Sequence, residues 1–544
     1  MAANEIPLRI RIGVTGHRSY HDADGLARSV KATLRSRIFE LFDPPPPAGL
    51  ATPLSFTVLT SLAEGADRLV ATEVMEFPDS EITAVLPYAA DEYQESFTTP
   101  EAQKDFWAWL DRAGKSVILR PGVTKASESG IRKAAYEAAG RFVVDNCDLL
   151  IALWDGREAQ GRGGTAEIVA YARSKNRPLV IVSTLDPENV RIERGNGLSG
   201  RALERVAYFN GFPLPEATIR TYVDNLYRAL FENREGGKIP ETVRSWIRER
   251  LLPWYARASM IAKQNQKMYN RAGLAVYALT PLAVAAVAIG ILVHGWSFGA
   301  FLIEFVLLMA VYIIIRIAGR RKVHDRWIET RFLTENLRAA VFLFSCGSEP
   351  SGFVFPPLAR TVLRDDEWIQ RLFDEIMRRA GRPAGCPQID VKDHAEFIRI
   401  RWVGKQIEFH EKKKVKAGKI SGSLEIIGQG VFLAAIVAAA SHIALRLMGY
   451  QGLSAWLENP AAFLAVVLPA VGAAVGGIRS HREYSRLEKR SRSMEAVLKD
   501  LDQRYASVAD ADALKALLQE TELLMLQETQ DWLVLMKSVV IRAV

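Results

Sequence analysis

The first 212 residues alternate between short apolar runs and amphipathic stretches, with polar turns between them. The runs at 8–14, 55–59, 147–154 and 178–183 have the length and the β-branched content of buried strands. The segments EITAVLPY and KSVILRPG indicate two more strands, and helical patterns separate the runs. This alternation predicts a doubly wound α/β domain with a parallel sheet of about six strands.

A different pattern begins near residue 271, where long uncharged runs replace the short ones. Four runs, at 272–293, 297–315, 426–445 and 459–478, are long enough to cross a hydrocarbon core, which needs about 20 helical residues. They come in two pairs, so we expect an α-helical transmembrane region with four spans in two hairpins. The alternative is the core of a soluble bundle, but these runs leave no polar face to meet water.

Composition agrees with this division. The chain has 544 residues, of which 49% are hydrophobic and 24% charged, and its mean hydropathy of +0.02 is high for so charged a chain. The predicted regions are the α/β domain at 1–212, a helical connector at 213–270, the first membrane hairpin with its following cytoplasmic helix at 271–345, a cytoplasmic excursion at 346–400, and the second hairpin with C-terminal helices at 401–544. We expect two helices in the connector, with a hinge at Gly236, Gly237 and Pro240.

Basic residues flank the spans on one side only. Lys and Arg cluster before the first and third spans and after the second and fourth, whereas the hairpin turns hold almost none. The positive-inside rule therefore places both termini and the α/β domain in the cytoplasm. These residues also account for the net charge of +8 and the pI near 9.2, because they meet anionic lipid. The sequence lacks helix-turn-helix and zinc-finger spacings, so we expect no nucleic-acid partner.

The spacing of Cys147, Cys346 and Cys386 suits neither a disulfide framework nor a metal cluster. We therefore predict no metal site and no cofactor. The amino terminus is polar and basic without an apolar core, so we expect no cleavable signal peptide and insertion through the internal spans.

Three of the strand-to-helix turns carry glycine, hydroxyl and charged residues. They lie at 15–18, at 61–65 and at 161–165. In right-handed βαβ units such turns meet at the carboxyl edge of the sheet, where helix N-termini attract anions. The predicted ligand-binding residues are Gly16, His17, Arg18, Glu64, Asp67, Gly163, Gly164, Thr165 and Glu167.

The residue types at these turns suit a nucleotide. A guanidinium such as that of Arg18 can clamp a phosphate with paired hydrogen bonds, and a carboxylate suits ribose hydroxyls. Gly163 and Gly164 would let the backbone approach the ligand, and Thr165 is expected to cap the next helix. The alternative for the Gly-Gly pair is a tight turn that needs glycine for its own geometry.

The two hairpins look like copies of one unit, each with a basic lead-in, two spans and a long charged helix. Glu304 lies inside the second span, where an isolated carboxylate costs on the order of 3 kcal/mol. We expect it to face water or a partner, or to be protonated or hydrogen-bonded within the bundle. Beyond that span Trp327, Arg331, Glu335 and Arg338 fall on one helical stripe, for which a solvated, salt-bridged face is the alternative. Four spans make only a small bundle, so a pore would need several chains.

Four motifs in the α/β region occur in the order GVTGHR, SLAEGADRL, LPY and GGTAE. This order resembles the SLOG domains, the Rossmann-like superfamily that includes the LOG nucleotide phosphoribohydrolases, the DprA proteins and nucleotide-sensing modules of bacterial antiviral systems. The resemblance implies a Rossmann-like domain that binds a nucleotide or a nucleotide-derived signal. The LOG enzymes carry PGGxGTxxE, whereas here Glu167 follows Thr165 by two positions and the proline is absent. We therefore predict no catalytic residue.

The membrane hairpins resemble a second family, the SLATT proteins, whose two-span modules accompany SLOG domains. The likeness lies in YARASMIAKQNQKMYNRAG before the first span and HDRWIETRFLTENLRAAVF after the second. It implies a pore-forming or membrane-disrupting effector of the bacterial inner membrane that a nucleotide signal switches on in antiviral defence. Three hypotheses stand: this ligand-gated pore, a membrane-tethered LOG-like nucleotide hydrolase, and a non-pore sensor that signals to a partner protein. The expected partners are a nucleotide-derived signal, membrane lipid and further copies of the chain.

Overall fold

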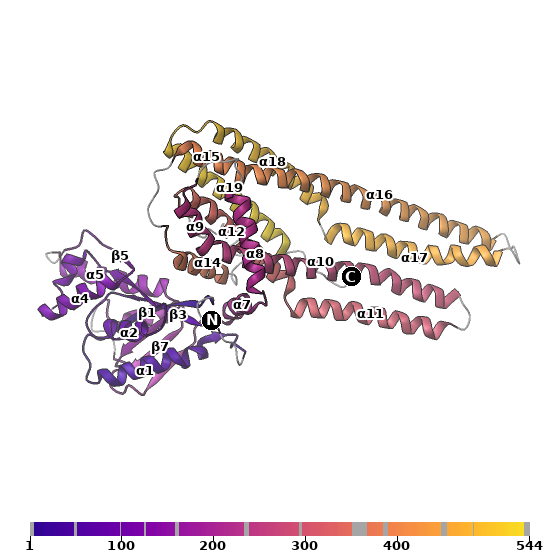
Figure 1. Ribbon diagram of the computed structural model, residues 1–544. Helices are drawn as coiled ribbons and strands as arrows, with labels where there is room; N and C mark the ends of the chain where they lie inside the picture. The colour runs from indigo at the N-terminus through magenta and orange to yellow at the C-terminus, as the bar shows by residue number, and fades with distance from the viewer. Residues whose placement is uncertain are drawn as a thin grey trace. The chain divides into compact units, whose positions relative to one another are not determined.

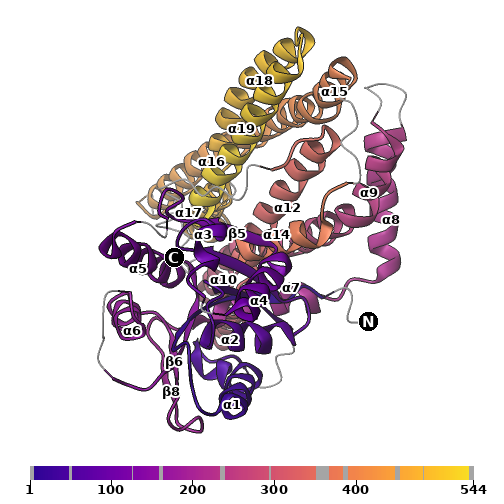
Figure 2. The same ribbon diagram turned by 90° about the vertical axis from the view of Figure 1, so that its left-hand side faces the viewer.

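The computed structural model describes most of the chain as two compact units (Figures 1 and 2). The described residues are 5–47, 52–97, 99–124, 127–157, 163–232, 239–292, 296–350, 367–383, 390–447, 454–481 and 483–537. The first unit, here called the α/β unit, comprises Met1–Phe212 and Arg364–Glu375. The second, here called the helical unit, comprises Pro213–Leu363 and Ile376–Val544.

The α/β unit is built on a seven-stranded sheet with the order β5-β4-β3-β1-β6-β7-β8. The strands are β1 (Leu8–Gly16), β3 (Leu54–Thr60), β4 (Glu81–Leu86), β5 (Lys115–Ile118), β6 (Leu149–Trp154), β7 (Leu179–Ser183) and β8 (Val190–Glu193). All neighbours pair in parallel except β7 and β8. The predicted doubly wound α/β fold is confirmed. The sheet has one strand more than expected, because β8 is short and its apolar pattern is interrupted by Arg191 and Glu193.

Helices occupy the connections between the strands. They are α1 (Ala23–Arg35), α2 (Ala66–Met75), α3 (Ala90–Gln94), α4 (Pro100–Arg112), α5 (Ser129–Asn146), α6 (Thr165–Ser174) and α7 (Gly200–Gly211). Local sequence starts three of them, since Asp22 caps α1, Thr99 caps α4 ahead of Pro100, and Ser199 caps α7. α1 packs on α2, and α5 packs on α6. A further two-stranded pair joins β2 (Phe42–Asp43) to β9 (Leu198–Ser199).

The chain changes its direction of travel at the centre of the sheet. From β1 it proceeds outward through β3 and β4 to β5, and it then returns to the other side of β1 as β6. The register places Ile12 opposite Val58 on one side and Leu149 on the other. Ligands of open α/β sheets bind outside the carboxyl ends of the strands at such a switch point. The ends of β1 and β6 therefore define the place where a site is expected.

Four helices of the helical unit are long and apolar enough to cross a membrane. They are α10 (Leu252–Leu292), α11 (Ser297–Arg320), α16 (Lys405–Leu447) and α17 (Ser454–His481). Large apolar side chains cover their outer surface, and Phe298 and Ile426 are 81% and 72% exposed. Such a surface suits lipid rather than water. The four predicted spans in two hairpins are confirmed, and they indicate a multi-pass membrane protein.

The spans lie side by side in the order α11-α10-α17-α16 (Figure 1). Small residues set two of the close approaches. Gly290 of α10 faces Ala300 of α11, and Gly477 of α17 faces the ring of Tyr277 of α10, so an added Cβ at either glycine would collide with its neighbour. The row leaves α11 and α16 at its two ends.

The other helices of this unit form a body next to the spans. They are α8 (Glu216–Tyr227), α9 (Glu241–Arg250), α12 (Val323–Ser345), the end of α14 (Glu367–Ala380), α15 (Val391–Ile398), α18 (Tyr484–Ala506) and α19 (Ala511–Lys537). The connector holds α8, α9 and the start of α10, so the expectation of two helices was wrong. Leu251 and Leu252 at the α9–α10 junction are buried, because α9 packs on α10 and α12. The predicted hinge glycines lie outside the described residues, as do 351–366 and 384–389, with Cys386, of the expected excursion.

The two hairpins share one architecture in the structure. In the first, α12 packs back along α10, and in the second, α18 packs back along α16 (Figures 1 and 2). The break between the second span and the returning helix has the same form in both, with Lys322 at φ 47° and Glu483 at φ 50°. A left-handed conformation at a non-glycine residue is uncommon, so its presence at the same junction supports an internal repeat.

Candidate functional site

The turns after β1 and β3 lie against each other at the carboxyl edge of the sheet. Ala66 N–H donates to the carbonyl of His17 at 3.1 Å, which ties the start of α2 to the first turn. Gly65 has a φ of 81°, and a Cβ there would lie 2.5 Å from the same carbonyl oxygen. Gly16 in turn faces Ala66. The contact between the first two predicted turns therefore depends on glycine.

The switch point itself is closed by a polar pair. His17 follows β1 and Asp155 follows β6, and His17 Nε2 lies 3.0 Å from Asp155 Oδ1. Partial burial opposes ionisation of Asp155, but hydrogen bonds from Arg157 N–H and from His17 outweigh it and lower the pKa of the carboxyl. About a third of the His17 side chain is exposed. The pair thus presents a charged, accessible group where a ligand of this fold would lie.

The third turn is held by its own carboxylate. Gly163 N–H donates to Glu167 Oε2 at 2.6 Å, and Arg141 lies 3.8 Å from the other oxygen of Glu167. Gly163 has a φ of 83°, so glycine is needed for the turn itself. The expected cap was wrong: α6 begins at Thr165, its N-cap is Gly164, and no side chain caps it. One residue of difference places the Thr165 hydroxyl inside the first turn instead of ahead of it.

A cluster of tyrosines that the sequence reasoning did not single out joins the first two turns to α5. Tyr88, which follows β4, has its hydroxyl 2.7 Å from that of Tyr136 on α5. Tyr93 lies edge-on to Tyr88 at 5.6 Å between ring centroids and is buried. Burial raises the pKa of Tyr93, and the charge of Arg18 opposes that rise. The LPY motif could have pointed to Tyr88, since it lies at the end of β4, the strand next to β3.

The Tyr136 side of α5 also reaches the third turn. A Cβ at Gly163 would lie 3.3 Å from Tyr136 Cβ and 3.0 Å from the backbone nitrogen of Glu137. The three predicted turns are therefore brought to one edge, two by direct contact and the third through α5. Two of the predicted carboxylates bind the backbone of their own turns instead of facing the edge. Glu167 accepts a hydrogen bond from Gly163 N–H, and Asp67 accepts one from Ala63 N–H at 3.3 Å.

Asp67 is 8% exposed. Burial raises its pKa, and this effect outweighs the hydrogen bonds from Thr60, Ala63 and Ser61 and the charge of Arg18. Arg18 reaches the carbonyl of Ser96 at the hydrogen-bond limit of 3.5 Å, a weak contact that leaves its guanidinium available to an anion. Glu64 is half-buried in the second turn. Arg18 and His17 thus supply the exposed and half-buried donors at this edge.

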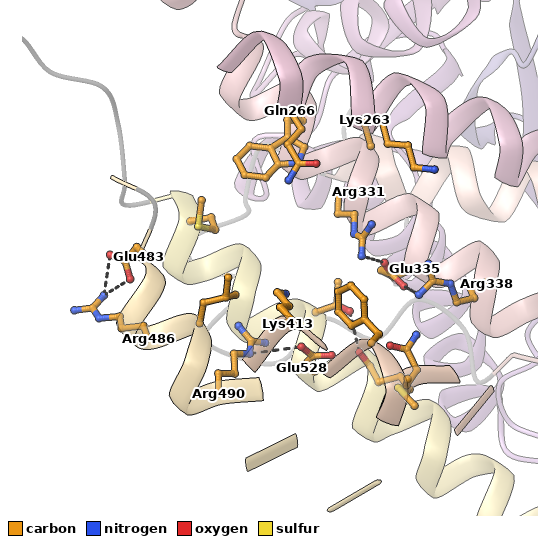
Figure 3. A pocket seen from close by; sticks show the side chains of 18 of the residues that line it. Lys263, Gln266, Arg331, Glu335, Arg338, Lys413, Glu483, Arg486, Arg490 and Glu528 are labelled. Carbon is orange, nitrogen blue, oxygen red and sulfur yellow. Dashed lines mark hydrogen bonds and ion pairs between the residues drawn. The ribbon is translucent and has the colours of Figure 1, made fainter. Parts of the chain in front are cut away.

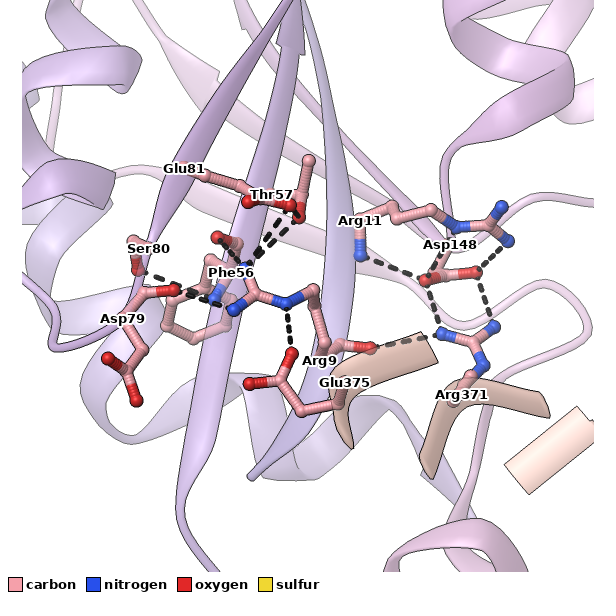
Figure 4. Close-up of polar contacts among 10 residues, drawn as sticks. All are labelled: Arg9, Arg11, Phe56, Thr57, Asp79, Ser80, Glu81, Asp148, Arg371 and Glu375. Carbon is pink, nitrogen blue, oxygen red and sulfur yellow. Dashed lines mark hydrogen bonds and ion pairs between the residues drawn. The ribbon is translucent and has the colours of Figure 1, made fainter. Parts of the chain in front are cut away.

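The opposite, amino edge of the sheet anchors helix α14. Arg371 of α14 donates to both oxygens of Asp148 at 2.7 Å, and Arg11 of β1 donates to the same carboxylate at 2.9 Å (Figure 4). Arg9 Nε donates to Glu375 at 2.8 Å. Burial alone would raise the pKa of Asp148, but the charges and hydrogen bonds of Arg371 and Arg11 hold it well below its usual range. Nothing in the sequence pattern predicted this anchor.

In the membrane region, Glu304 of α11 lines a cavity of about 250 Å³ with residues of α10 and α17, among them Ala288 and Ala462. The carboxylate therefore faces neighbouring helices. Among the residues that the structure describes, no group of three or more His, Cys, Asp and Glu side chains is placed to hold a metal ion.

Comparison with protein-family models gives no match, and no curated protein matches the sequence.

Proposed function

We propose that the chain is a membrane effector that binds a nucleotide or nucleotide-derived signal at the carboxyl edge of the sheet and opens a pore in the bacterial inner membrane, in antiviral defence. One observation carries most of the proposal. The turns after β1 and β3 contact each other, and the His17–Asp155 pair links the ends of β1 and β6 at the topological switch point, where Arg18 follows His17. The chain that carries this edge also holds four candidate spans. This joins a ligand site to a membrane region, as the resemblance to SLOG and SLATT proteins implies.

Helix α14 is shared by the two units, and we assign to it the transfer of ligand occupancy to the membrane region. β1 carries Arg9 and Arg11 at its start and leads to His17 and Arg18 at its end. Helix α14 is held by those two arginines through Glu375 and Asp148. Its last turn belongs to the helical unit, where Trp246 of α9 donates to the carbonyl of Ala380 at 3.2 Å. Helix α9 leads directly into α10, which contains the first span.

The arrangement of the spans favours assembly of several chains. A single row of four helices encloses no channel, and a water-filled path needs helices on all sides. The outer surface of the row is apolar, and Glu304 lies within the membrane region without a basic partner among the contacts that the structure describes. The proposed pore therefore forms between copies of the chain.

Binding is better supported than hydrolysis. Glu167, the carboxylate nearest in position to the glutamate of the LOG pattern, accepts a hydrogen bond from Gly163 within its own turn. A carboxylate engaged in this way stabilises the turn and has less freedom to act as a general base.

The test compares full-length protein with two arginine variants. Arg18→Ala removes the proposed phosphate clamp, and Arg28→Ala removes an exposed arginine of α1 on the same unit. Small molecules that co-purify with each protein from phage-infected cells are identified by mass spectrometry and then added to dye-loaded liposomes that contain the protein. We expect wild type and Arg28→Ala to carry the nucleotide and leak dye, and Arg18→Ala to do neither. Binding without leakage in wild type would favour the non-pore sensor, and released base would favour the hydrolase.

A further inference from the structure

A cavity with charged walls lies in the helical unit, between the two hairpin repeats. It has a volume of about 430 Å³ and is lined by α10 and α12 of the first repeat, α16 and α18 of the second, and α19 (Figure 3). Drug-sized ligands occupy cavities of about this volume. The cavity adjoins the spans, since Tyr269 and Asn270 in its wall immediately precede the first apolar run and Glu483 follows the last.

The walls of this cavity carry more positive than negative charge. Its six basic residues are Lys263, Arg331, Arg338, Lys413, Arg486 and Arg490, and its three acidic residues are Glu335, Glu483 and Glu528. The stripe predicted from the sequence supplies several of them. Its residues Trp327, Arg331, Glu335 and Arg338 all line the cavity. The salt bridges of the alternative reading are present within the stripe, but the face borders a cavity instead of open solvent.

The acidic residues do not neutralise the basic ones. Glu335 is shared by Arg331 and Arg338, each at 2.6 Å. Glu528 lies 3.7 Å from Arg490 and is also the partner of His410. Each of these carboxylates therefore serves two bases, and the cavity keeps an excess of cationic donors.

Two donors in the wall, the Lys413 ammonium and Nη2 of Arg490, make no hydrogen bond to a carboxylate among the described residues. Lys413 lies over the ring of Phe409 at 4.9 Å and, among the described residues, makes no ion pair within 4 Å. Burial lowers the pKa of Lys413 to about 8. The positive charges of Arg331 and Arg490 lower it as well, whereas the negative charges of Glu528 and Glu335 act in the opposite direction. Nη2 of Arg490 is buried with no hydrogen-bond partner. Figure 3 shows Lys413 and Arg490 on the same side of the cavity, next to Glu528.

A half-buried ammonium without an ion pair and a buried guanidinium N–H without a hydrogen bond are both costly unless an anion completes them. We propose that the cavity between the two repeats binds a phosphate group, with Lys413 and Arg490 as its principal donors. The phosphate belongs either to an anionic lipid headgroup at the membrane surface or to a soluble phosphorylated molecule. This site is separate from the carboxyl edge of the sheet and does not depend on it.

The test uses full-length protein and substitutions that keep side-chain length. Lys413→Met and Arg490→Met remove the charges, and Lys412→Met is the matched control, because Lys412 is the exposed neighbour on α16 and pairs with Glu408. One arm titrates detergent-solubilised protein with inorganic phosphate. The other compares nanodiscs of phosphatidylcholine with nanodiscs that also contain phosphatidylglycerol, and detects retained lipid by native mass spectrometry. We expect each cavity variant to bind at least about tenfold more weakly in one arm, the effect of losing one charge-assisted hydrogen bond.

A readout on the unmutated chain covers the case in which a variant fails to fold. The bound phosphate should slow acylation of Lys413 by an amine-reactive reagent several-fold relative to Lys412. Protection by phosphatidylglycerol alone identifies a lipid headgroup, and protection by inorganic phosphate identifies a soluble source. Equal labelling of Lys413 in all conditions, or binding that survives in both cavity variants, would overturn the proposal. Arg18→Ala should leave this protection unchanged, which separates the result from that for the nucleotide site.

Discussion

The anchor of α14 on the sheet gives the sharpest quantitative expectation. Arg371→Met keeps the alkyl chain but removes two hydrogen bonds to Asp148, each of 2.7 Å, and one of 3.1 Å to the carbonyl of Arg9. Asp148 keeps the backbone N–H of Arg11 at 2.8 Å and its guanidinium at 2.9 Å. The carboxylate is therefore not stripped of partners, and the loss should fall below the roughly 3–5 kcal/mol of a fully broken buried pair.

We expect the free energy that holds α14 on the sheet to fall by about 2–3 kcal/mol. Hydrogen bonds to charged groups contribute about 1.5–3 kcal/mol each, and water that hydrates Asp148 in place of the guanidinium recovers part of that. The change is local, so hydrogen exchange of the full-length protein in detergent is the appropriate assay. Amides of residues 367–375 that exchange through release of this anchor should do so about 30- to 150-fold faster, since each 1.4 kcal/mol is a factor of ten.

The matched control is Arg382→Met. Arg382 pairs with Glu349 at 2.6 Å, but its side chain is 78% exposed, so we expect a change of less than about 1 kcal/mol. The variant Arg371→Met should also keep nucleotide binding and lose ligand-triggered leakage, because the path from β1 to α9 is interrupted. Unchanged exchange in residues 367–375 would refute the energetic reasoning, and retained leakage would show that the signal does not pass through α14.

Two further predictions concern pH and topology. The pKa of Asp148 is depressed in the folded chain. The carboxylate therefore contributes its full stability above the ordinary pKa of about 3.9, and this contribution is lost as the pH falls from there through the lower pKa of the folded chain. Hydrogen exchange of residues 367–375 should accelerate on acidification in wild type and much less in Asp148→Asn. A cysteine at Trp296, which is 64% exposed at the α10–α11 turn, should react with an impermeant thiol reagent from outside the cell, whereas one at Lys322 should not. The reverse labelling would contradict a cytoplasmic α/β unit.

The parts of the fold that the sequence predicted are those that depend on local periodicity. Runs of Val, Ile and Leu between polar turns mark the central strands, and uncharged runs mark the spans, whatever the rest of the chain does. The edge strand β8 was missed because the charged residues Arg191 and Glu193 interrupt its apolar pattern and its pairing with β7 is not a local property. The cap of α6 was misplaced by one residue, within the usual uncertainty of a helix boundary.

The contacts that the sequence could not predict join residues far apart in the chain. Arg371 follows Asp148 by 223 residues, and neither has a neighbour that marks it as half of an ion pair. Tyr88 and Tyr136 meet because β4 and α5 pack together, so the LPY motif alone could not identify the partner. The stripe on α12 was visible, but its role depended on α16 and α18 facing it across a cavity.

Under the two proposals, both sites would act on α10. α10 has 41 residues and α16 has 43, so each is roughly 60 Å long at 1.5 Å per residue and runs without interruption from the body into a span. A displacement at the end of such a helix that lies in the body must reach the span unless the helix bends, and Pro281 is where α10 can bend. In the proposed mechanism the nucleotide acts on α10 through α14 and α9, whereas the cavity lies between α10 and α16 themselves. A phosphate there would hold the two repeats at a fixed separation. Under both proposals, nucleotide binding at the sheet would have to change the separation of two repeats that the phosphate holds. A membrane rich in the bound lipid would then raise the nucleotide concentration that is needed to open the pore.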